Sequence, residues 1–210
     1  MTERLEGLRL CRGWLELRAQ EALLEELAAL LDEAPPFRPS MPQSGRPFSV
    51  RMSNAGPLGW VSDRDGYRYQ RHHPETGKPW PAIPGSVLEI WRALAEYPAP
   101  PEACLINLYD ATARMGLHQD RDEAAMDAPV ISISLGSAAR FRIARSRSGP
   151  TQSFTIESGD VLVLGGPSRL AFHGIAGVIP GTSPLPSLPA GAERINLTLR
   201  RVTLSATPIS

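Results

Sequence analysis

Residues 129–166, PVISISLGSAARFRIARSRSGPTQSFTIESGDVLVLGG, indicate the class of fold that we expect. Short runs rich in β-branched residues recur along them, separated by Gly, Ser, Asp or Pro. Strands at such close intervals, with no helical pattern between them, are typical of an antiparallel sandwich or jelly roll. Similar runs, CLINLY at 104–109 and RINLTLR at 194–200, extend the β-rich region to residues 103–201.

Two helices are predicted before this region. Leucines recur at helical spacing, with glutamates between them, over residues 15–31. A second helix is predicted to begin at Ser86, which forms a capping box with Glu89, and to end before Pro98. We therefore expect a mixed α+β, β-rich fold in which the N-terminal helices brace one outer face of a jelly-roll sheet.

Residues 34–85 are rich in Pro, Gly and Arg, yet they contain Trp60, Tyr67, Tyr69 and Trp80. Aromatic side chains in a loop-like segment need something to cover. They belong either to a packing flap or to a lid over a substrate, and the residues alone leave both open. A second biased segment, residues 180–191, is predicted to be a surface loop between two strands.

The composition indicates one domain, residues 1–210, because the chain is long enough for one sizeable core. Net charge is zero and Lys78 is the only lysine, so local arginine patches would have to hold any nucleic acid. Cys11 and Cys104 are too few for a disulfide framework. No run of about 18 apolar residues that could span a membrane occurs in the sequence. The N-terminal residues around Glu3 are charged and no long apolar run follows them. We expect a cytoplasmic monomer without membrane contact.

The stretch LHQDRDE at 117–123 contains the strongest candidate for a metal site. On a strand, side chains two residues apart project from the same face, so His118 and Asp120 can be directed at one point. His173 supplies a third ligand, because the other histidines lie in the loop-like segment. Two histidines and one carboxylate form the facial triad that holds non-haem Fe(II) and leaves positions open for co-substrate and oxygen. A His-x-Asp pair also occurs by chance, so a second feature is needed.

That second feature is an anchor for an anionic co-substrate. Polar residues of RINLTLR alternate with apolar ones: Arg194, Asn196, Thr198 and Arg200. A solvated edge strand shows the same alternation. In the sharper interpretation, one arginine forms a bidentate pair with the distal carboxylate of a dicarboxylate and the other lies near the metal. Asn107 and Tyr109, likewise two residues apart, add an amide and a phenol to the same pocket.

These motifs are similar, in content and order, to those of the AlkB family of Fe(II)/2-oxoglutarate-dependent dioxygenases. The resemblance runs from Arg51 to Arg201 through the following stretches: SNAGPLGW, DGYRY, TGKPWPAIP, CLINLY, LHQDRDE, PVISISLG, GDVLVLGGPSRLAFHGI and RINLTLR. It implies a double-stranded β-helix (jelly roll) with residues 103–201 as its core and residues 35–85 as a nucleotide-recognition lid. It also implies Fe(II) as the metal, with 2-oxoglutarate and O2 as co-substrates.

The resemblance further implies roles for single residues. His118, Asp120 and His173 correspond to catalytic iron ligands, and Arg194 to the salt-bridge partner of the distal carboxylate of 2-oxoglutarate. The remaining residues of that co-substrate pocket are Asn107, Tyr109, Asn196 and Arg200.

On the substrate side, the resemblance implies that Trp60 stacks the damaged base against His173. Asp122 would accept a hydrogen bond from the exocyclic amine of the base, and Tyr67 would contact the lesion strand. The other implied substrate contacts are Met52, Arg121 and Arg147.

A basic run accompanies these residues: Arg140, Arg142, Arg145 and Arg147. It either follows a phosphate backbone or forms a solvated strand face, and the sequence leaves both open.

The activity that the resemblance implies is direct-reversal DNA repair. N1-methyladenine and N3-methylcytosine in methylated single-stranded DNA would be oxidatively demethylated, with release of formaldehyde and conversion of 2-oxoglutarate and O2 to succinate and CO2. RNA stays open as a further substrate. One alternative is a dioxygenase that acts on a protein side chain or a small molecule through the same metal site. Another is a catalytically silent binding module, which a closed structural metal site would distinguish because it has no vacant position.

Overall fold

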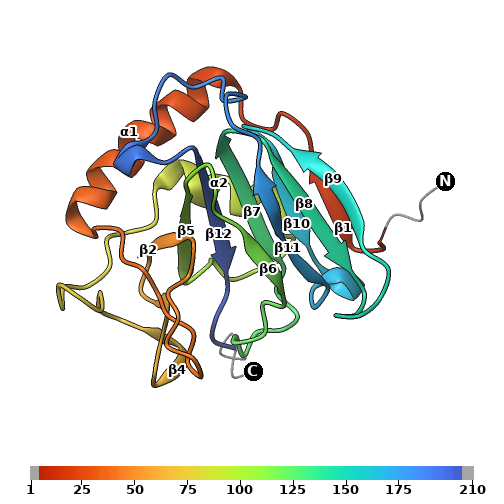
Figure 1. Cartoon of the computed structure of the whole chain (residues 1–210), viewed down its shortest axis with the longest axis horizontal. Helices are drawn as coiled ribbons and strands as arrows, with labels where there is room; N and C mark the ends of the chain where they lie inside the picture. Colours follow the sequence, from red (N-terminus) through yellow and green to blue (C-terminus); the bar gives the residue numbers. More distant parts are fainter. Residues whose placement is uncertain (1–4, 205–210) are drawn as a thin grey trace.

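Two antiparallel sheets face each other and enclose part of the apolar core (Figure 1). The computed structural model describes residues 5–204, so Glu3 and the rest of 1–4, and residues 205–210, lie outside the described part. The larger sheet contains, in spatial order, β1 (Leu8–Cys11), β10 (Val161–Leu164), β7 (Val130–Gly136), β12 (Arg194–Arg200), β5 (Ala103–Tyr109) and β2 (Arg51–Ala55). The smaller sheet contains β6 (Met115–His118), β11 (Phe172–Val178), β8 (Ala139–Ala144) and β9 (Gln152–Ile156).

The remaining elements are a hairpin and four helical segments within the described residues. They are β3 (Gly59–Asp63), β4 (Gly66–Gln70), α1 (Leu17–Glu33), α2 (Gly85–Leu94), η1 (Gly166–Ser168) and η2 (Pro189–Gly191). The fold is thus β-rich and mixed, as the sequence pattern predicts.

Each β-branched run that the sequence pattern singled out forms a strand: β5, β7, β8, β9, β10 and β12. Strands without such a run include β11 and β6, the strand on which the His-x-Asp argument placed His118, and the two pair with each other in the smaller sheet. Both contain glycine, which weakens a strand signal because it has no side chain to pack. Their formation depends on pairing with distant strands, which a local pattern does not contain.

Helices α1 and α2 cover the outer face of the larger sheet. The buried leucines of α1 and the apolar side of α2 form one cluster with residues of β5, β7, β10 and β12. Figure 1 shows α1 running along one side of the molecule, over the sheet that contains β5 and β12. Among the described residues, no helix is both long and apolar enough to cross a membrane.

The predicted capping box of α2 is wrong. The helix begins at Gly85 with Pro84 as its N-cap, and Ser86 lies inside the first turn. The Ser86 hydroxyl donates to Glu26 Oε1 of α1 at 2.9 Å and does not cap its own helix. The proline ring presets φ at −52° directly before the helix, so a side-chain cap is not required to direct the chain into the first turn.

Strand β12 lies in the middle of the larger sheet, between β7 and β5, and is buried along its whole length. The edge-strand interpretation of RINLTLR is therefore wrong. Its apolar residues pack toward the helices in one cluster: Ile195, Leu197 and Leu199. Because successive residues point to opposite faces of a sheet, the polar residues of β12 point into the space between the two sheets. Buried polar side chains need hydrogen-bonding or charged partners. We therefore expect the functional site in the space that the polar residues of β12 face.

Residues 34–85 are more ordered than their composition suggests, because they contain β2 and the β3–β4 hairpin. Trp80 is buried and packs against Phe37 and His73. Tyr67, in contrast, is 48% exposed and stacks on Trp60. Figure 1 shows this segment, in orange and yellow, at the edge of the larger sheet where β2 lies beside β5. Different aromatics of the segment thus serve as packing residues and as an exposed surface.

The segment 180–191 is mostly exposed, as the sequence predicts. Leu185 is the exception, since it is buried in the same cluster as α1. One leucine therefore anchors an otherwise solvated loop to the core.

Gly174 is the point at which β11 passes closest to β6. A Cβ atom added there would lie 2.5 Å from the Met115 carbonyl oxygen and 2.7 Å from that of Gly116. Because both neighbours are backbone atoms, we expect Gly174→Ala to separate the two strands and to lower the free energy of unfolding by about 1–3 kcal/mol. Chemical denaturation measures this loss. Gly177→Ala, on the same strand with nothing within 4 Å of its added Cβ, is the matched control and should leave stability unchanged or slightly raised.

Candidate active site

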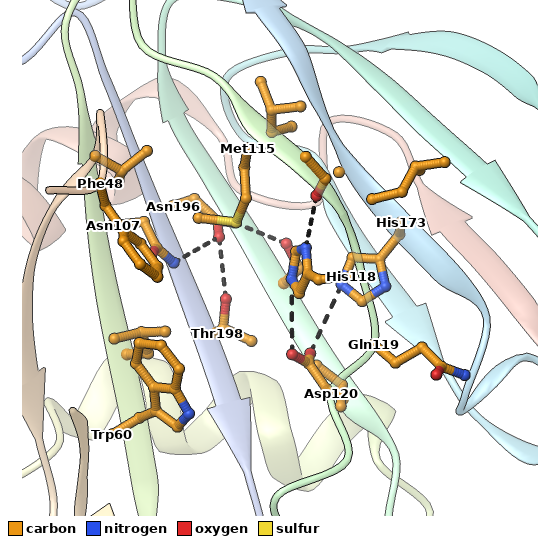
Figure 2. Close-up of a pocket in the computed structure, with 18 of the residues that line it drawn as sticks. Phe48, Trp60, Asn107, Met115, His118, Gln119, Asp120, His173, Asn196 and Thr198 are labelled. Carbon is orange, nitrogen blue, oxygen red and sulfur yellow. Dashed lines mark hydrogen bonds and ion pairs between the residues drawn. The ribbon is translucent and has the colours of Figure 1, made fainter. Parts of the chain in front are cut away.

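The pairing of β6 with β11 brings two distant histidines together. His118, the last residue of β6, and His173, in β11, are Cα partners in the antiparallel register, and their ring centroids are 4.5 Å apart. Asp120 lies two residues beyond β6, not on the strand as predicted, because the chain leaves the sheet after His118. From there its carboxylate reaches both rings, with Oδ1 3.8 Å from His118 Nε2 and Oδ2 3.7 Å from His173 Nε2 (Figure 2).

The hydrogen bonds of this cluster leave its ligand atoms free. His118 Nδ1 lies 3.0 Å from the Gly116 carbonyl oxygen, and His173 Nδ1 lies 3.0 Å from that of Ala171. A ring nitrogen that faces a carbonyl oxygen carries the hydrogen, so each Nε2 keeps its lone pair. Asp120 Oδ2 is buried and accepts no hydrogen bond.

One ligand atom from each of the three residues lies within 4.8 Å of the others. Two imidazole nitrogens and one carboxylate oxygen, oriented by backbone carbonyls, are a donor set that suits Fe(II) with open coordination positions. The residues present therefore fit this metal.

The charges around the cluster favour the forms that bind a metal. Burial would raise the pKa of Asp120, but Arg200 and the two histidines outweigh it and hold that pKa well below its usual value. Burial lowers the pKa of His173 to about 4, although Asp120 acts in the opposite direction. A carboxylate and a neutral imidazole are therefore present near neutral pH, as metal binding requires.

Arg194 forms the other end of the site. Its side chain is fully buried, and its guanidinium donates to Ser134 Oγ at 2.8 Å and to the Ser137 carbonyl oxygen at 3.2 Å. Among the described residues, Asp160 acts on it electrostatically but no carboxylate forms an ion pair with it, and its Nε has no hydrogen-bond partner there. Burial lowers the pKa of Arg194 to about 10, which still leaves it charged near neutral pH. A buried guanidinium without a carboxylate is a strong binding site for an anion, because an unpaired buried charge is costly.

Polar side chains of β5 and β12 line the space between Arg194 and the histidines. The strand register places Asn196 opposite Asn107 and Arg194 opposite Tyr109. Asn107 Nδ2 donates to Asn196 Oδ1 at 3.3 Å, while Asn107 Oδ1 has no partner. The Tyr109 hydroxyl donates only to the sulfur of Met115, at 3.7 Å, which is a weak acceptor. Figure 2 shows Asn107, Asn196 and Thr198 on one side of the pocket and the histidines on the other. Asn107 Oδ1 and the Tyr109 hydroxyl, which lack strong hydrogen-bond partners among the described residues, therefore lie between Arg194 and the histidines.

A single cavity of about 810 Å³ contains this whole arrangement. Every site residue that the sequence or the resemblance pointed to contributes to its lining: Met52, Trp60, Tyr67, Asn107, Tyr109, His118, Asp120, Arg121, Asp122, Arg147, His173, Arg194, Asn196 and Arg200. The sequence pattern missed Ser132, Met115 and Phe141, which also line it. Ser132 faces Thr198 in the register of β7 and β12, so only the strand pairing reveals it.

Comparisons with known proteins agree with this geometry. A model of the 2OG-Fe(II) oxygenase superfamily matches residues 7–200. The alpha-ketoglutarate-dependent dioxygenase AlkB homolog of Caulobacter vibrioides is 52% identical over 190 residues, covering 90% of this chain and 84% of that protein. The chain belongs to the AlkB family. The AlkB protein of Escherichia coli K12 is 41% identical over 172 residues, covering 80% of this chain and 79% of that protein.

The solved structure of OsALKBH1 is also similar to this AlkB-family protein, with a TM-score of 0.79 and 28% identity over 93% of this chain and 96% of that one. The AlkB-family protein is thus an Fe(II)/2-oxoglutarate-dependent dioxygenase, with a His-Asp-His cluster that can hold its metal.

The open side of the AlkB-family pocket is aromatic. Trp60 and Tyr67 stack with ring centroids 5.6 Å apart, and Trp60 Nε1 donates to Asp122 Oδ2 at 2.9 Å. Phe141 stacks on His173 at 6.0 Å. Of the basic run at 140–147, Arg147 alone lines the cavity among the described residues. Its guanidinium lies 5.6 Å from the centre of the Phe172 ring.

Proposed function

We propose that this AlkB-family dioxygenase demethylates N1-methyladenine and N3-methylcytosine in single-stranded DNA. One observation carries the proposal: the metal-binding cluster, the buried guanidinium and the exposed stack of Trp60 and Tyr67 share one cavity. Such a cavity accommodates a planar base next to the metal. The aromatic stack suits nucleobases of any sequence, since every base has a π-face.

The proposal extends to the organisation of the chain. Residues 1–210 form one dioxygenase domain with the double-stranded β-helix (jelly roll) topology. Residues 103–201 are its core, and residues 35–85 form a lid that recognises the nucleotide. The two facing sheets and the hairpin beside them support this division.

In the proposed site, His118, Asp120 and His173 hold Fe(II), and Arg194 pairs with the distal carboxylate of 2-oxoglutarate. Asn107, Tyr109, Asn196 and Arg200 complete the co-substrate pocket. The iron, when bound, supplies the redox chemistry that couples oxidation of 2-oxoglutarate to succinate and CO2 with insertion of one oxygen atom of O2 into a methyl C–H bond. The C–N bond of the N-hydroxymethyl group then breaks: its electron pair goes to the base nitrogen, the hydroxyl proton is released, and the carbon leaves as formaldehyde.

The chain's own residues would select and orient the base. Asp122 is exposed and lines the cavity, where a side-chain oxygen would accept a hydrogen bond from the exocyclic amine that both methylated bases carry. Trp60 would stack on the base, with Tyr67 beside it. The further contacts proposed are Met52, Arg121 and Arg147. Because the methyl group lies on the Watson–Crick edge, the base must be unpaired or flipped out, which a methylated base permits at lower cost.

Removal of the stacking ring should weaken substrate binding specifically. We expect Trp60→Ala to raise the KM for a methylated oligonucleotide roughly 10- to 100-fold, since base–aromatic stacking contributes about 1–3 kcal/mol. The KM for 2-oxoglutarate should stay unchanged. Formaldehyde release at varied oligonucleotide concentration measures both effects. Trp14→Ala is the control, because Trp14 is an exposed tryptophan that does not line the cavity. Equal KM values for the two variants would contradict the role of Trp60.

The direct test of the function is mass spectrometry of a methylated single-stranded oligonucleotide incubated with protein, Fe(II), 2-oxoglutarate and O2. Loss of one methyl group should require every component when each is omitted in turn. An RNA of the same sequence, assayed in parallel, measures the preference between DNA and RNA. Succinate formation with a methylated peptide but not with either oligonucleotide would refute the proposed substrate class.

A further inference from the structure

A cluster of buried polar side chains lies beneath the metal-binding residues. Its members, here called the linking cluster, are Tyr69, Glu123, Arg169 and Arg200. The side chains of Glu123, Arg169 and Arg200 are 1%, 4% and 6% exposed, respectively. The formal charges of the cluster cancel: the two arginines are matched by Glu123 and the neighbouring Asp120. Buried charges in such a set must be positioned with care, since each depends on its partners.

Arg169 holds the chain segment that carries Asp120. Its Nη1 donates to the Asp120 carbonyl oxygen at 2.5 Å, and its Nε donates to that of Ala128 at 2.8 Å. Its Nη2 donates to Glu123 Oε2 at 3.0 Å. One side chain therefore fixes both ends of the segment that follows β6, and Glu123 fixes that side chain.

The other Glu123 oxygen leads to the lid. The Tyr69 hydroxyl donates to Glu123 Oε1, and Arg200 Nη1 donates to the Tyr69 oxygen at 3.3 Å. Arg200 Nη2 in turn donates to Asp120 Oδ1 at 2.7 Å. Tyr69 lies on β4 directly opposite Trp60 on β3. The hairpin with the exposed aromatic stack is thus two hydrogen bonds away from the carboxylate that faces both histidines.

The cluster also has a second arrangement available. Arg200 Nε is buried without a hydrogen-bond partner, and it lies 3.5 Å from Glu123 Oε1. If Tyr69 withdraws with the hairpin, Glu123 Oε1 loses its donor and attracts the idle Nε of Arg200. That movement rotates the guanidinium whose Nη2 orients Asp120. Coupling between distant sites requires an element with two discrete arrangements, and the hydrogen bonds of Glu123 and Arg200 provide two.

We propose that Tyr69 and Glu123 are positioning residues that link the lid hairpin to Asp120, so that oligonucleotide binding and metal binding strengthen each other. The inference rests on the proposed function for the identity of the ligand under the lid. By thermodynamic linkage, the factor by which an oligonucleotide tightens metal binding equals the factor by which the metal tightens oligonucleotide binding.

Calorimetric titration with Mn(II), a probe that accepts similar ligands without reacting with 2-oxoglutarate, tests this coupling in the 210-residue chain. With 2-oxoglutarate present, we expect a methylated single-stranded oligonucleotide to lower the Kd of Mn(II) about fivefold or more in the unaltered chain. In Tyr69→Phe this factor should fall to about one. Tyr97→Phe is the matched control and should keep the factor, because within residues 5–204 the Tyr97 hydroxyl bonds only to the exposed side chain of Asp127.

A second variant separates positioning from folding. Glu123→Gln keeps the shape of the side chain but removes the charge that holds Arg169, which in turn bonds to Asp120. We expect it to weaken Mn(II) binding by up to about 10-fold without oligonucleotide, the lower end of the range for loss of a direct partner of a metal ligand. Circular dichroism shows whether Glu123→Gln folds. If it does not fold, the Mn(II) titration of Tyr69→Phe tests the inference by itself. A folded Tyr69→Phe with the coupling factor of the unaltered chain would overturn the inference.

The demethylation assay reports on the proposed function separately. If an oligonucleotide tightens Mn(II) binding but keeps its methyl group, the link stands and the proposed reaction fails. If demethylation proceeds while the coupling factor of the unaltered chain is one, the reaction stands and the link is refuted.

Discussion

Replacement of His118 by alanine should abolish turnover of 2-oxoglutarate that depends on a methylated oligonucleotide. The substitution removes one of the three ligand atoms that lie within 4.8 Å of one another and leaves two, from Asp120 and His173. Loss of an outer partner of a metal ligand already costs about 10–100-fold, so loss of a ligand itself should cost considerably more. Succinate release, followed by mass spectrometry under saturating Fe(II), measures the effect.

The fold should survive this change, because the His118 side chain is 35% exposed and lies at the end of its strand. Circular dichroism and thermal unfolding check that it does. His72→Ala is the matched control, since His72 is exposed and does not line the cavity. A folded His118→Ala protein with full turnover would remove the metal assignment altogether.

Replacement of Arg194 by glutamine should raise the KM for 2-oxoglutarate at least about 100-fold, or roughly 2.7 kcal/mol. The guanidinium is fully buried and, within residues 5–204, donates to Ser134 and Ser137 but forms no ion pair with a carboxylate, so a co-substrate carboxylate would gain a charge-assisted pair in a dry environment. Glutamine removes the charge but keeps an amide donor near Ser134. Initial rates at varied 2-oxoglutarate concentration measure the change.

The effect should be confined to the co-substrate. We expect the KM for the oligonucleotide to change little. Arg194 and Arg200 are the two ends of β12, and it is Arg200 that bonds to Tyr69, on the hairpin with the aromatic stack. Arg201→Gln provides the control, since Arg201 follows β12 directly and pairs with Glu102, away from the cavity. If both variants had the KM of the unaltered chain for 2-oxoglutarate, the anchor would have to be another residue.

Much of the larger sheet could be predicted from the sequence. β-Branched runs such as VISISLG and RINLTLR form strands because side-chain branching suits an extended backbone. The same alternation predicted one polar face on β12, and that face does line the cavity. The pattern did not exclude a solvated edge strand, because alternation is identical for an edge and for a centre that borders a polar cavity. Only the pairing of β12 with both β5 and β7 settles the matter.

The smaller sheet and the linking cluster were less accessible to prediction. Strands β6 and β11 contain glycines that obscure their pattern, although Gly174 is needed where the two strands approach. Glu123 stands in the same motif as Asp120, but nothing in the motif indicates that Arg169 and Tyr69 are its partners. At Ser86 the sequence predicted a contact that does not form. The residue matches a capping box, but its hydroxyl bonds to Glu26 of another helix.

The sequence by itself determined the class of fold, the residue types at the metal-binding cluster and the alternation that separates apolar from polar faces. These properties depend on the nearest few residues, through backbone preference and side-chain periodicity. The tertiary structure alone decided which histidine faces which, that Arg194 is buried with no ion-paired carboxylate in the described part of the chain, and that Tyr69 reaches Glu123. Those contacts join residues far apart in the chain, and they depend on strand register and burial, which local spacing does not encode.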